Sequence, residues 1–363
     1  MVDVSRNMLV LKQYQLCGRC LARQADVIDG KSAEKCFICR GLMDSLDTIV
    51  DRVVKAIKPY EFQTMLVGAT LPTQVYERED ALRARLKIRG RESVKSQLTR
   101  EVGLRLARKT GKKVDYRRPD VIINLTIDKE GNTAVLATAR PVAFEGRYVK
   151  KARGLPQKQD RCPMCQGKGC PLCDYSGISG YDSVEGILVQ QAMAKTGGQT
   201  PRISWIGSED QNSLVLGSGR LFYIRISDPK KRRLKRLPGR DGVSARITRI
   251  LDDIPDFQQR FAVKTRILVK SDRQFSIQDI RKLRSLAGSE VKFENKKTVT
   301  KKIYAVHAKR VSKDEIALTI TADGGLPIKQ FVGGEEYMDP NISKLLESRC
   351  QCVSFDILAV DFQ

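Results

Sequence analysis

Apolar residues recur at helical spacing in the first third of the chain. The spacing predicts a helix over residues 42–58, a strand over 62–67 and a mostly helical stretch over 78–113. Two alternating runs over 121–127 and 133–139 flank a Lys-Glu-Gly-Asn turn, which predicts a β-hairpin. We therefore expect helices followed by paired strands in this part of the chain.

Strands predominate in the second half. A helix predicted over 183–193 precedes a strand over 221–226, whose residues alternate between an apolar and a wet face. Ser276 and Asp279 can cap the first turn of another helix, expected over 276–286. Further strands are expected over 263–269, 303–309 and 315–321. The patterns together predict an α+β protein.

The chain is strongly basic. Its 363 residues carry 66 Lys and Arg against 42 Asp and Glu, a formal net charge of +24. Because the excess has one sign, it favours a polyanionic partner, foremost nucleic acid, over a heat-adapted surface, which would balance both signs. A chain of this length is long enough for two or three domains with cores of their own.

Two basic segments are candidates for contacts with a nucleic acid. A block over 230–236, bracketed by Asp228-Pro229 and Pro238-Gly239, is predicted to be a loop that is either solvated or bound to an RNA backbone. The outer face of the helical stretch is either a solvated surface or a phosphate-binding one, since few acidic residues neutralise it. That face carries Arg83, Arg85, Lys87, Arg89, Arg91, Lys95, Arg100, Arg105, Arg108, Lys109, Lys112 and Lys113.

No feature of the sequence indicates a membrane. No apolar run approaches the roughly 20 residues of a spanning helix, and no lipidation motif occurs. Residues 1–13 lack the apolar core and cleavage site of a signal peptide. We therefore expect a cytoplasmic protein, and no feature calls for an obligatory protein partner.

The cysteines fall into two groups with the spacing of metal ligands. Each group contains two Cys-x-x-Cys pairs, and two pairs so close together favour a tetrahedral zinc site over a redox motif or a disulfide. We predict two structural zinc ions, bound by Cys17, Cys20, Cys36 and Cys39 and by Cys162, Cys165, Cys170 and Cys173. Cys350 and Cys352 alternate on a predicted strand and are expected in the core. His307 is the only histidine, which excludes a Ser-His-Asp triad and metal sites built on histidine.

Asp210 is a candidate catalytic carboxylate. It lies in a turn rich in Gly, Ser and Asn directly before a predicted strand, where glycines let a ligand approach the backbone. Arg220 follows closely and could keep the carboxylate ionised, as a carboxylate nucleophile requires. An Asp in such a turn is also a common turn former, so composition alone leaves both interpretations open.

Four stretches resemble one family. Gly-Ser-Glu-Asp at 207–210, followed by Leu-Gly-Ser-Gly-Arg at 216–220, resembles the Gly-Arg-Glu-Asp segment of the archaeal and eukaryotic tRNA pseudouridine synthases that modify uridines 54 and 55, the "pseudouridine synthase ten" family. Residues 124–148 are similar to the family's RNA-binding THUMP region and its exit. Gly-Leu-Pro-Gln at 154–157 with the following cysteines is similar to its linker. Asp-Gly-Gly-Leu-Pro-Ile-Lys-Gln-Phe at 323–331, Pro-Asn-Ile-Ser at 340–343 and residues 352–360 are similar to its C-terminal signature.

The resemblance implies an organisation and a site. It implies a zinc module over 1–45, a THUMP-like RNA-binding domain over 46–153, a zinc-stiffened linker over 154–180 and a catalytic domain with a mixed or antiparallel sheet over 181–363. It also implies that tRNA is the partner, that no catalytic cofactor is used, and that Asp210 is the nucleophile or base. Lys329 would then hold Asp210 ionised, and Ile328 and Leu358 would form walls of the uridine slot. For Ile328 and Leu358, ordinary strand core is the alternative.

Three positions depart from the family pattern. Ser208 replaces an arginine, and Pro327 stands where an aromatic residue is common. The tyrosine that stacks on the target base is missing from 263–268, where Thr265 is the expected occupant. Ser208 and the missing tyrosine support a second hypothesis, a non-catalytic zinc-containing protein that binds or folds tRNA and retains the synthase architecture, whereas the retained Asp210 speaks against it. A third, a basic zinc protein acting on DNA or ribosomal RNA, explains the charge and the cysteines but not the C-terminal signature.

Overall fold

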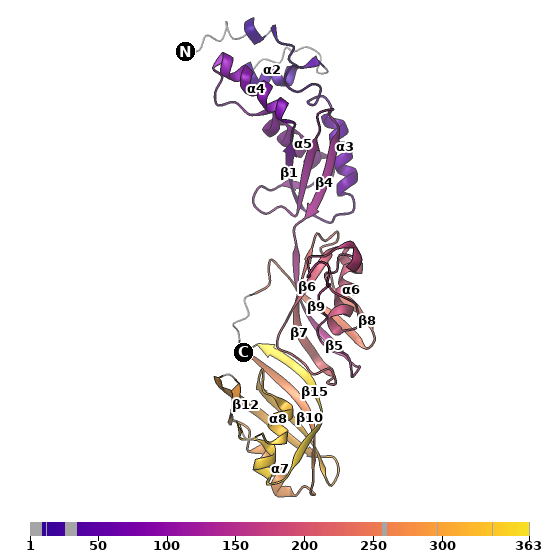
Figure 1. The fold of residues 1–363 in the computed structure, drawn as a ribbon, viewed down its shortest axis with the longest axis vertical. Helices are drawn as coiled ribbons and strands as arrows, with labels where there is room; N and C mark the ends of the chain where they lie inside the picture. The colour runs from indigo at the N-terminus through magenta and orange to yellow at the C-terminus, as the bar shows by residue number, and fades with distance from the viewer. Residues whose placement is uncertain are drawn as a thin grey trace. The chain divides into compact units, whose positions relative to one another are not determined.

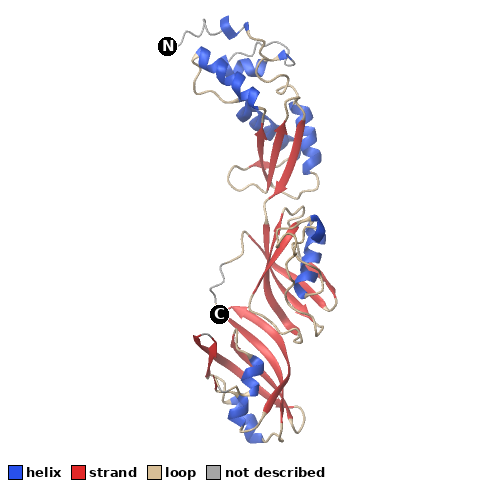
Figure 2. Ribbon diagram, in the orientation of Figure 1, coloured by secondary structure: helices blue, strands red, loops and turns tan. Residues whose placement is uncertain are grey.

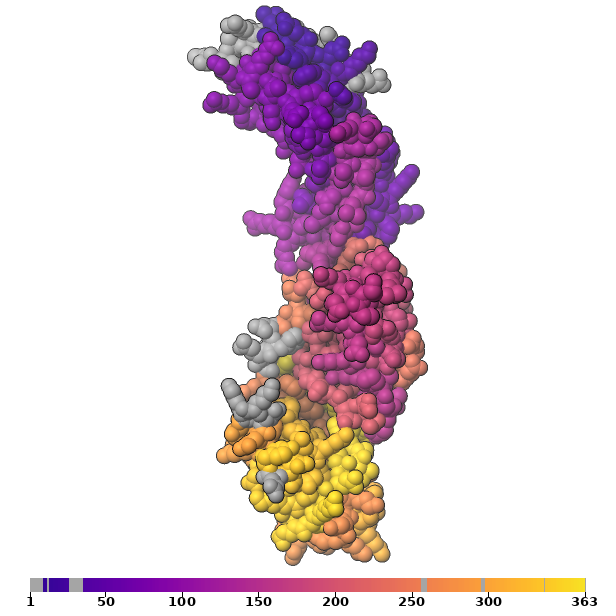
Figure 3. All heavy atoms as spheres, viewed as in Figure 1, coloured from indigo at the N-terminus to yellow at the C-terminus, as the bar shows by residue number. Residues whose placement is uncertain are grey.

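The chain folds into two compact units, each with its own sheet and core. A computed structural model describes residues 9–11, 13–25, 35–255, 260–295, 297–335 and 337–362. Unit 1 comprises residues 1–140 and 230–232, and unit 2 comprises residues 141–229 and 233–363. Apart from residues 230–232, unit 1 carries the indigo and purple colours of Figures 1 and 3, and unit 2 carries magenta to yellow.

In unit 1, helices cover one face of a four-stranded sheet. The strand order is β2-β1-β3-β4, with β1 parallel to β2 and β3 and with β3 antiparallel to β4. Helices α3 and α5 pack on the sheet from the same side (Figure 2). The elements are α2 (Gly18–Ala25), α3 (Leu46–Ile57), β1 (Thr64–Thr70), α4 (Thr73–Leu86), α5 (Val94–Thr110), β2 (Lys113–Val114), β3 (Val121–Ile127) and β4 (Thr133–Ala139).

The predicted elements of unit 1 are confirmed, except that one predicted helical stretch forms two helices. The helix predicted over 42–58 begins at Leu46, and the predicted hairpin strands match β3 and β4. The stretch 78–113 is split into α4 and α5 because the chain leaves helical geometry between them: Lys87 and Gly90 have positive φ values of 52° and 70°. A left-handed residue after the last turn ends a helix.

The described residues of unit 2 form an eleven-stranded sheet. The order is β14-β11-β12-β13-β10-β15-β7-β5-β9-β8, and β6 pairs with β7 off this path. Nearly all pairs are antiparallel, and β15 with β7 is the parallel one, so the expected mixed sheet is confirmed. The strands are β5 (Val142–Lys150), β6 (Gln199–Trp205), β7 (Val215–Ser227), β8 (Arg236–Arg240), β9 (Val243–Leu251), β10 (Phe261–Ser271), β11 (Glu290–Asn295), β12 (Lys297–Arg310), β13 (Glu315–Asp323), β14 (Met338–Asp339) and β15 (Cys350–Phe362).

The sheet of unit 2 carries two cores, and β15 contributes residues to both. One core gathers β5 to β9 with α6 (Val184–Thr196), whose N-cap is Ser183. The other gathers β10 to β15 with α7 (Ile277–Arg284), α8 (Ile328–Gly333) and α9 (Ile342–Leu346). Ser276 and Asp279 form the predicted capping box of α7.

Three expectations about unit 2 differ from the structure. Pro238 and Gly239, expected in a loop, lie in β8, which is an edge strand where proline costs no ladder hydrogen bond. The units divide after Arg140 rather than near residue 153, because β5 pairs with β7 and β9. Ile328 is the first residue of α8, so it does not lie in a strand. Within the described residues, no helix has both the length and the apolar character needed to cross a membrane.

Candidate active site

Asp210 lies in the loop that connects β6 to β7. The loop turns at Gly207, whose φ is 72°, and reaches the strand at Val215. The Asp210 carboxylate closes a turn, because Oδ1 accepts a hydrogen bond from Asn212 N at 2.9 Å. The carboxylate is thus held in a fixed direction at the entrance to β7.

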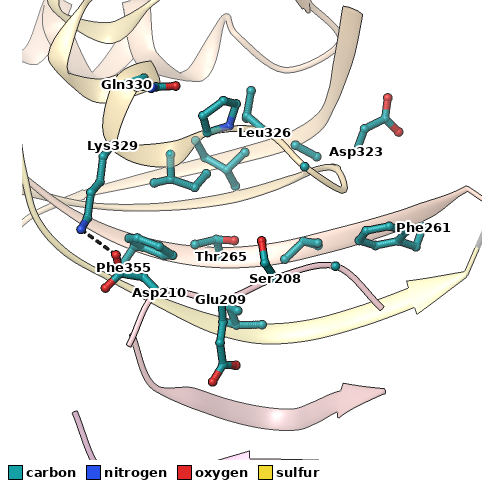
Figure 4. A pocket seen from close by; sticks show the side chains of 18 of the residues that line it. Ser208, Glu209, Asp210, Phe261, Thr265, Asp323, Leu326, Lys329, Gln330 and Phe355 are labelled. Atoms are coloured by element: carbon teal, nitrogen blue, oxygen red, sulfur yellow. Dashed lines mark hydrogen bonds and ion pairs between the residues drawn. The ribbon is translucent and has the colours of Figure 1, made fainter. Parts of the chain in front are cut away.

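Lys329 is the cationic partner of Asp210. Its Nζ donates a hydrogen bond to Asp210 Oδ2 at 2.7 Å, which Figure 4 marks with a dashed line. This hydrogen bond holds the pKa of the Asp210 carboxyl below its ordinary value, aided by Asn212 N–H and opposed by partial burial. The same bond raises the pKa of Lys329. Asp210 is therefore ionised at neutral pH.

A pocket of about 550 Å³ opens beside this ion pair. Its volume lies in the range of roughly 300–1,000 Å³ that is usual for small-molecule sites. One wall comes from strands β10, β13 and β15, and the loop 207–210 and the start of α8 complete it (Figure 4). Lining residues of this strand wall are Phe261, Val263, Thr265, Ile320, Ala322, Asp323, Phe355 and Ile357. The wall is largely apolar, as a slot for a planar base requires.

Arg220 lines the pocket but does not make the contact with Asp210 that the sequence predicted. It is 2% exposed, and Nη2 donates to the backbone carbonyls of Ile206 at 2.7 Å and Ser208 at 3.0 Å. Its closest carboxylate is Glu209, with Nη1 3.9 Å from Oε2. The guanidinium therefore holds the loop through its backbone carbonyls, and Lys329 is the cation that contacts Asp210.

Of the other candidate residues from the sequence, some line the pocket and one does not. Ile328 and Lys329 line it, whereas Leu358 is not among the lining residues. The β10–β15 ladder pairs Lys264 with Ala359 and Thr265 with Ile357, so a bulge skips Leu358 and gives its expected place to Ile357.

The positions that depart from the family pattern all lie at the pocket. Ser208, Thr265 and Pro327 line it, and none of them is aromatic or charged. Two aromatic residues that the sequence analysis missed, Phe261 and Phe355, line it as well. They lie in the same alternating phase as Val263 and Ile357, so strand alternation was the signal that could have found them.

Phe261 is packed tightly against two glycines. A Cβ built on Gly324 would come within 2.0 Å of the ring, and one on Gly207 within 3.1 Å. Only glycine leaves space for an aromatic ring at these two places. The glycines of the Asp loop and of the C-terminal signature thus place a ring at one end of the pocket.

Both predicted cysteine clusters are assembled with metal-site geometry. The four sulfurs of each cluster lie within 4.8 Å of one another. Sγ–Sγ separations are 3.7 Å for Cys17 and Cys39, 3.9 Å for Cys162 and Cys170 and 3.8 Å for Cys165 and Cys173. A tetrahedron with Zn–S bonds of about 2.3 Å has edges of roughly 3.8 Å. The clusters therefore fit zinc, and none of the cysteines forms a disulfide.

Part of the basic surface of unit 1 is neutralised within the unit. Ion pairs join Arg83 to Glu79, Arg100 to Glu92, Arg105 to Asp47 and Lys109 to Asp51, with distances from 2.5 to 3.3 Å. The acidic residues come partly from α3 and α4, which the sequence pattern could not place opposite α5. The surface available to phosphates is therefore smaller than the sequence suggests.

Comparisons with known proteins decide the family. Residues 49–126 match the family model "Pus10 THUMP domain, archaeal", and residues 144–284 and 268–361 match "Pus10, C-terminal". A protein of Nitrosopumilus maritimus named "tRNA pseudouridine synthase Pus10" is 31% identical, covering 97% of this chain and 96% of its own. The chain belongs to the Pus10 family. The predicted family and the α+β fold class with a THUMP domain are thereby confirmed.

Other Pus10 relatives align over nearly the same extent. Proteins of the same name from Cenarchaeum symbiosum and Methanosphaera stadtmanae are 32% and 26% identical and cover 94% and 99% of this chain and 89% and 99% of their own. The Pus10 C-terminal match contains the Asp210 loop, β10, α8 and β15. All the elements that form the pocket therefore belong to the family's C-terminal domain.

Proposed function

We propose that this protein converts uridine 54, uridine 55 or both in the TΨC loop of tRNA to pseudouridine, with Asp210 as nucleophile or base. Membership of the Pus10 family makes the chain a tRNA pseudouridine synthase, an RNA isomerase. The choice of uridines and the role of Asp210 are our inference. The observation that carries it is an ionised aspartate, paired with Lys329, at the edge of an apolar pocket of about 550 Å³.

The proposed reaction needs few residues. Pseudouridine formation breaks the bond between N1 of uracil and C1′ of ribose, turns the base and joins C5 to C1′. The proton of C5 is lost to solvent and N1 takes one up, so the product is an isomer of uridine. No oxidant or energy source is consumed. Asp210 would either attack the sugar or remove a proton from it, and Lys329 would keep the carboxylate ionised until then.

The pocket would receive the uridine after it has left the stacked loop of the tRNA. Ile328 and Ile357 would form apolar walls, and Ile357 takes the place that the sequence analysis gave to Leu358. Phe261 and Phe355 offer aromatic rings near a position where the family has a tyrosine, and we propose that one of them stacks on the base. Arg220 would act on the substrate through the shape of the loop that it supports.

The remaining parts would present the tRNA. Unit 1 contains the THUMP domain, and the part of its basic surface without internal ion pairs would contact phosphates. Zinc in the two cysteine clusters would be structural, since four thiolates leave no open coordination position. No catalytic cofactor is proposed, and a tRNA substrate makes the cytoplasm the expected compartment.

Unmodified tRNA transcripts test the proposal. The protein is incubated with wild-type transcript and with transcripts in which position 54 or position 55 is cytidine, and pseudouridine is mapped chemically. The proposal expects product at one or both positions, abolished at the substituted one. Pseudouridine formed only outside the TΨC loop would contradict the choice of uridines. Tight tRNA binding without any product would support the non-catalytic tRNA-binding alternative.

A further inference from the structure

A group of buried polar side chains lies beneath the Asp210 loop. Tyr148 and Lys150 have no exposed surface, Gln157 is 5% exposed, and the side chain of Glu209 is fully buried. Figure 4 shows the Glu209 side chain turned away from the pocket. We call Tyr148, Lys150, Gln157 and Glu209 the buried brace. The reaction proposed above uses none of these four side chains.

Lys150 is the centre of the buried brace. Its Nζ lies 3.0 Å from Glu209 Oε1 and donates hydrogen bonds to three backbone carbonyls, those of Leu155 at 3.1 Å, Gln211 at 3.2 Å and Asp210 at 3.4 Å. One ammonium thus joins the end of β5, the segment after it and the Asp210 loop.

The other members of the buried brace hold Glu209 in place. Tyr148 Oη donates to Glu209 Oε2 at 2.6 Å, and the backbone N–H of Glu209 donates to Gln157 Oε1 at 3.3 Å. Glu209 supplies the negative charge that lets an ammonium remain buried. The residue directly before Asp210 is therefore fixed through both its side chain and its backbone.

Holding the backbone at Asp210 also holds its carboxylate. The Asp210 carbonyl accepts a hydrogen bond from Ser213 N at 3.0 Å, and the carboxylate accepts one from Asn212 N in the same turn. Gly154 N donates to the Gln211 carbonyl at 3.0 Å from the other side. Because the turn includes the side chain, a shift of its carbonyls would shift the carboxylate.

Stability alone does not account for a charge at this place. An ion pair removed from water recovers its desolvation cost poorly, and apolar residues of similar size often stabilise a fold as well or better. Apolar residues, however, cannot donate hydrogen bonds to three carbonyls. The direct partner of Asp210 is a weaker restraint, because the Lys329 side chain is 60% exposed.

We propose that Lys150 is a positioning residue, which sets the direction of the Asp210 carboxylate through the carbonyls of the turn, with Glu209 as its counter-charge. The inference rests on the proposed function of Asp210. A displacement of about 1 Å at a reacting group can cost roughly a hundred-fold in rate. Loss of the buried ammonium should therefore lower kcat and leave the binding of tRNA unchanged.

Three variants of the buried brace and one control separate positioning from stability. Lys150→Met removes the hydrogen bonds to the carbonyls, and Glu209 keeps Arg220 as a counter-charge at 3.9 Å. Glu209→Gln leaves both Lys150 and Arg220 buried without this carboxylate, and the double variant leaves Arg220 alone without it. The control is Glu145→Gln: Glu145 also lies on β5, is 8% exposed, forms an ion pair with Arg249 and accepts a hydrogen bond from Thr248 Oγ1 at 2.7 Å.

The measurements are single-turnover rate, tRNA dissociation constant and Tm, with rates taken at a temperature where circular dichroism shows every variant folded. Lys150→Met and the double variant should both lose roughly a hundred-fold in rate at an unchanged dissociation constant. The double variant should have a lower Tm than Lys150→Met, because it leaves Arg220 buried without a carboxylate. Glu145→Gln should lower Tm and change the rate by less than about five-fold. Glu209→Gln should have the lowest Tm, because Lys150 and Arg220 both lose their carboxylate.

The signature of positioning is an equal loss of rate in Lys150→Met and the double variant despite their different Tm values, with a lowered Tm and a retained rate in Glu145→Gln. A double variant with the wild-type rate would overturn the inference, as would rates that follow Tm through all four variants. If Lys150→Met fails to fold, Lys150→Gln, which removes the ammonium and keeps a polar side chain, takes its place with the same expected loss of rate. Wild-type protein that forms no pseudouridine overturns the proposed function and this inference with it, whereas active wild type with active Lys150→Met overturns this inference only.

Discussion

Replacing Lys329 with methionine removes the charge that faces Asp210 and keeps most of the length of the side chain. Both partners reach solvent, with side chains 60% and 27% exposed, and an ion pair of that kind contributes roughly 0–1 kcal/mol to stability. The variant should therefore fold normally. The hydrogen bond of 2.7 Å is charge-assisted, and such bonds are worth about 1.5–3 kcal/mol. If it acts on the transition state, kcat should fall by roughly ten- to 150-fold.

The same variant should shift the acid limb of the pH profile. Lys329 is the main cause of the lowered Asp210 pKa, so wild type keeps the carboxylate charged to a pH below the ordinary value for aspartate, about 3.9. Without Lys329 the limb should move upward toward that value. At neutral pH Asp210 is ionised in both proteins, so the loss of rate there reports orientation of the carboxylate and not its protonation.

Tritium release from tRNA labelled at uracil C5 measures both effects, because C5 loses its hydrogen when it bonds to the sugar. The matched control is Lys344→Met, which removes an exposed pair with Asp339 at 3.0 Å on α9, outside the residues that line the pocket. The control should keep the wild-type rate and profile. If Lys329→Met also keeps the wild-type rate and an unshifted acid limb, Lys329 does not assist Asp210.

Three further predictions follow from the packing. Metal analysis should find two zinc ions per chain, and a chelator should release the ion of the second cluster first, since three of its four cysteines are partly exposed; simultaneous release would contradict this order. Glu79→Gln should destabilise unit 1 by roughly 3–5 kcal/mol, because Arg23 stays buried without its carboxylate at 2.7 Å, and unchanged hydrogen-exchange protection would refute it. Ile357→Ala should reduce kcat/KM more than Leu358→Ala, since only Ile357 lines the pocket, and equal losses would be inconsistent with the bulge in β15.

Local signals in the sequence were sufficient for much of the fold. Buried and exposed residues alternate along the hairpin strands β3 and β4, which flank a turn. The period of two and the turn residues are both visible in a short stretch of sequence. The capping box at Ser276 and the Cys-x-x-Cys pairs are likewise short patterns with one geometry each. For the same reason the sequence could place Asp210 at a strand entrance.

Features that depend on distant pairing could not be predicted in this way. The partner of Arg220 is set by the fold of the loop above it, and the place of Leu358 by a bulge opposite Lys264. Pro238 is admitted to β8 only because that strand lies at the edge of the sheet. Lys150 gave one usable signal, a charged residue in the same alternating phase as Phe144 and Tyr148, and its three carbonyl partners come from two other segments.

The most direct test of the account is Asp210→Asn, measured for both tRNA affinity and product. The amide keeps the size of the carboxylate and its contact with Asn212 N but cannot serve as nucleophile or base. The account predicts no detectable pseudouridine in the TΨC loop and a tRNA dissociation constant close to that of wild type. Pseudouridine formed by Asp210→Asn at the wild-type rate would show that the chemistry takes place elsewhere in the protein.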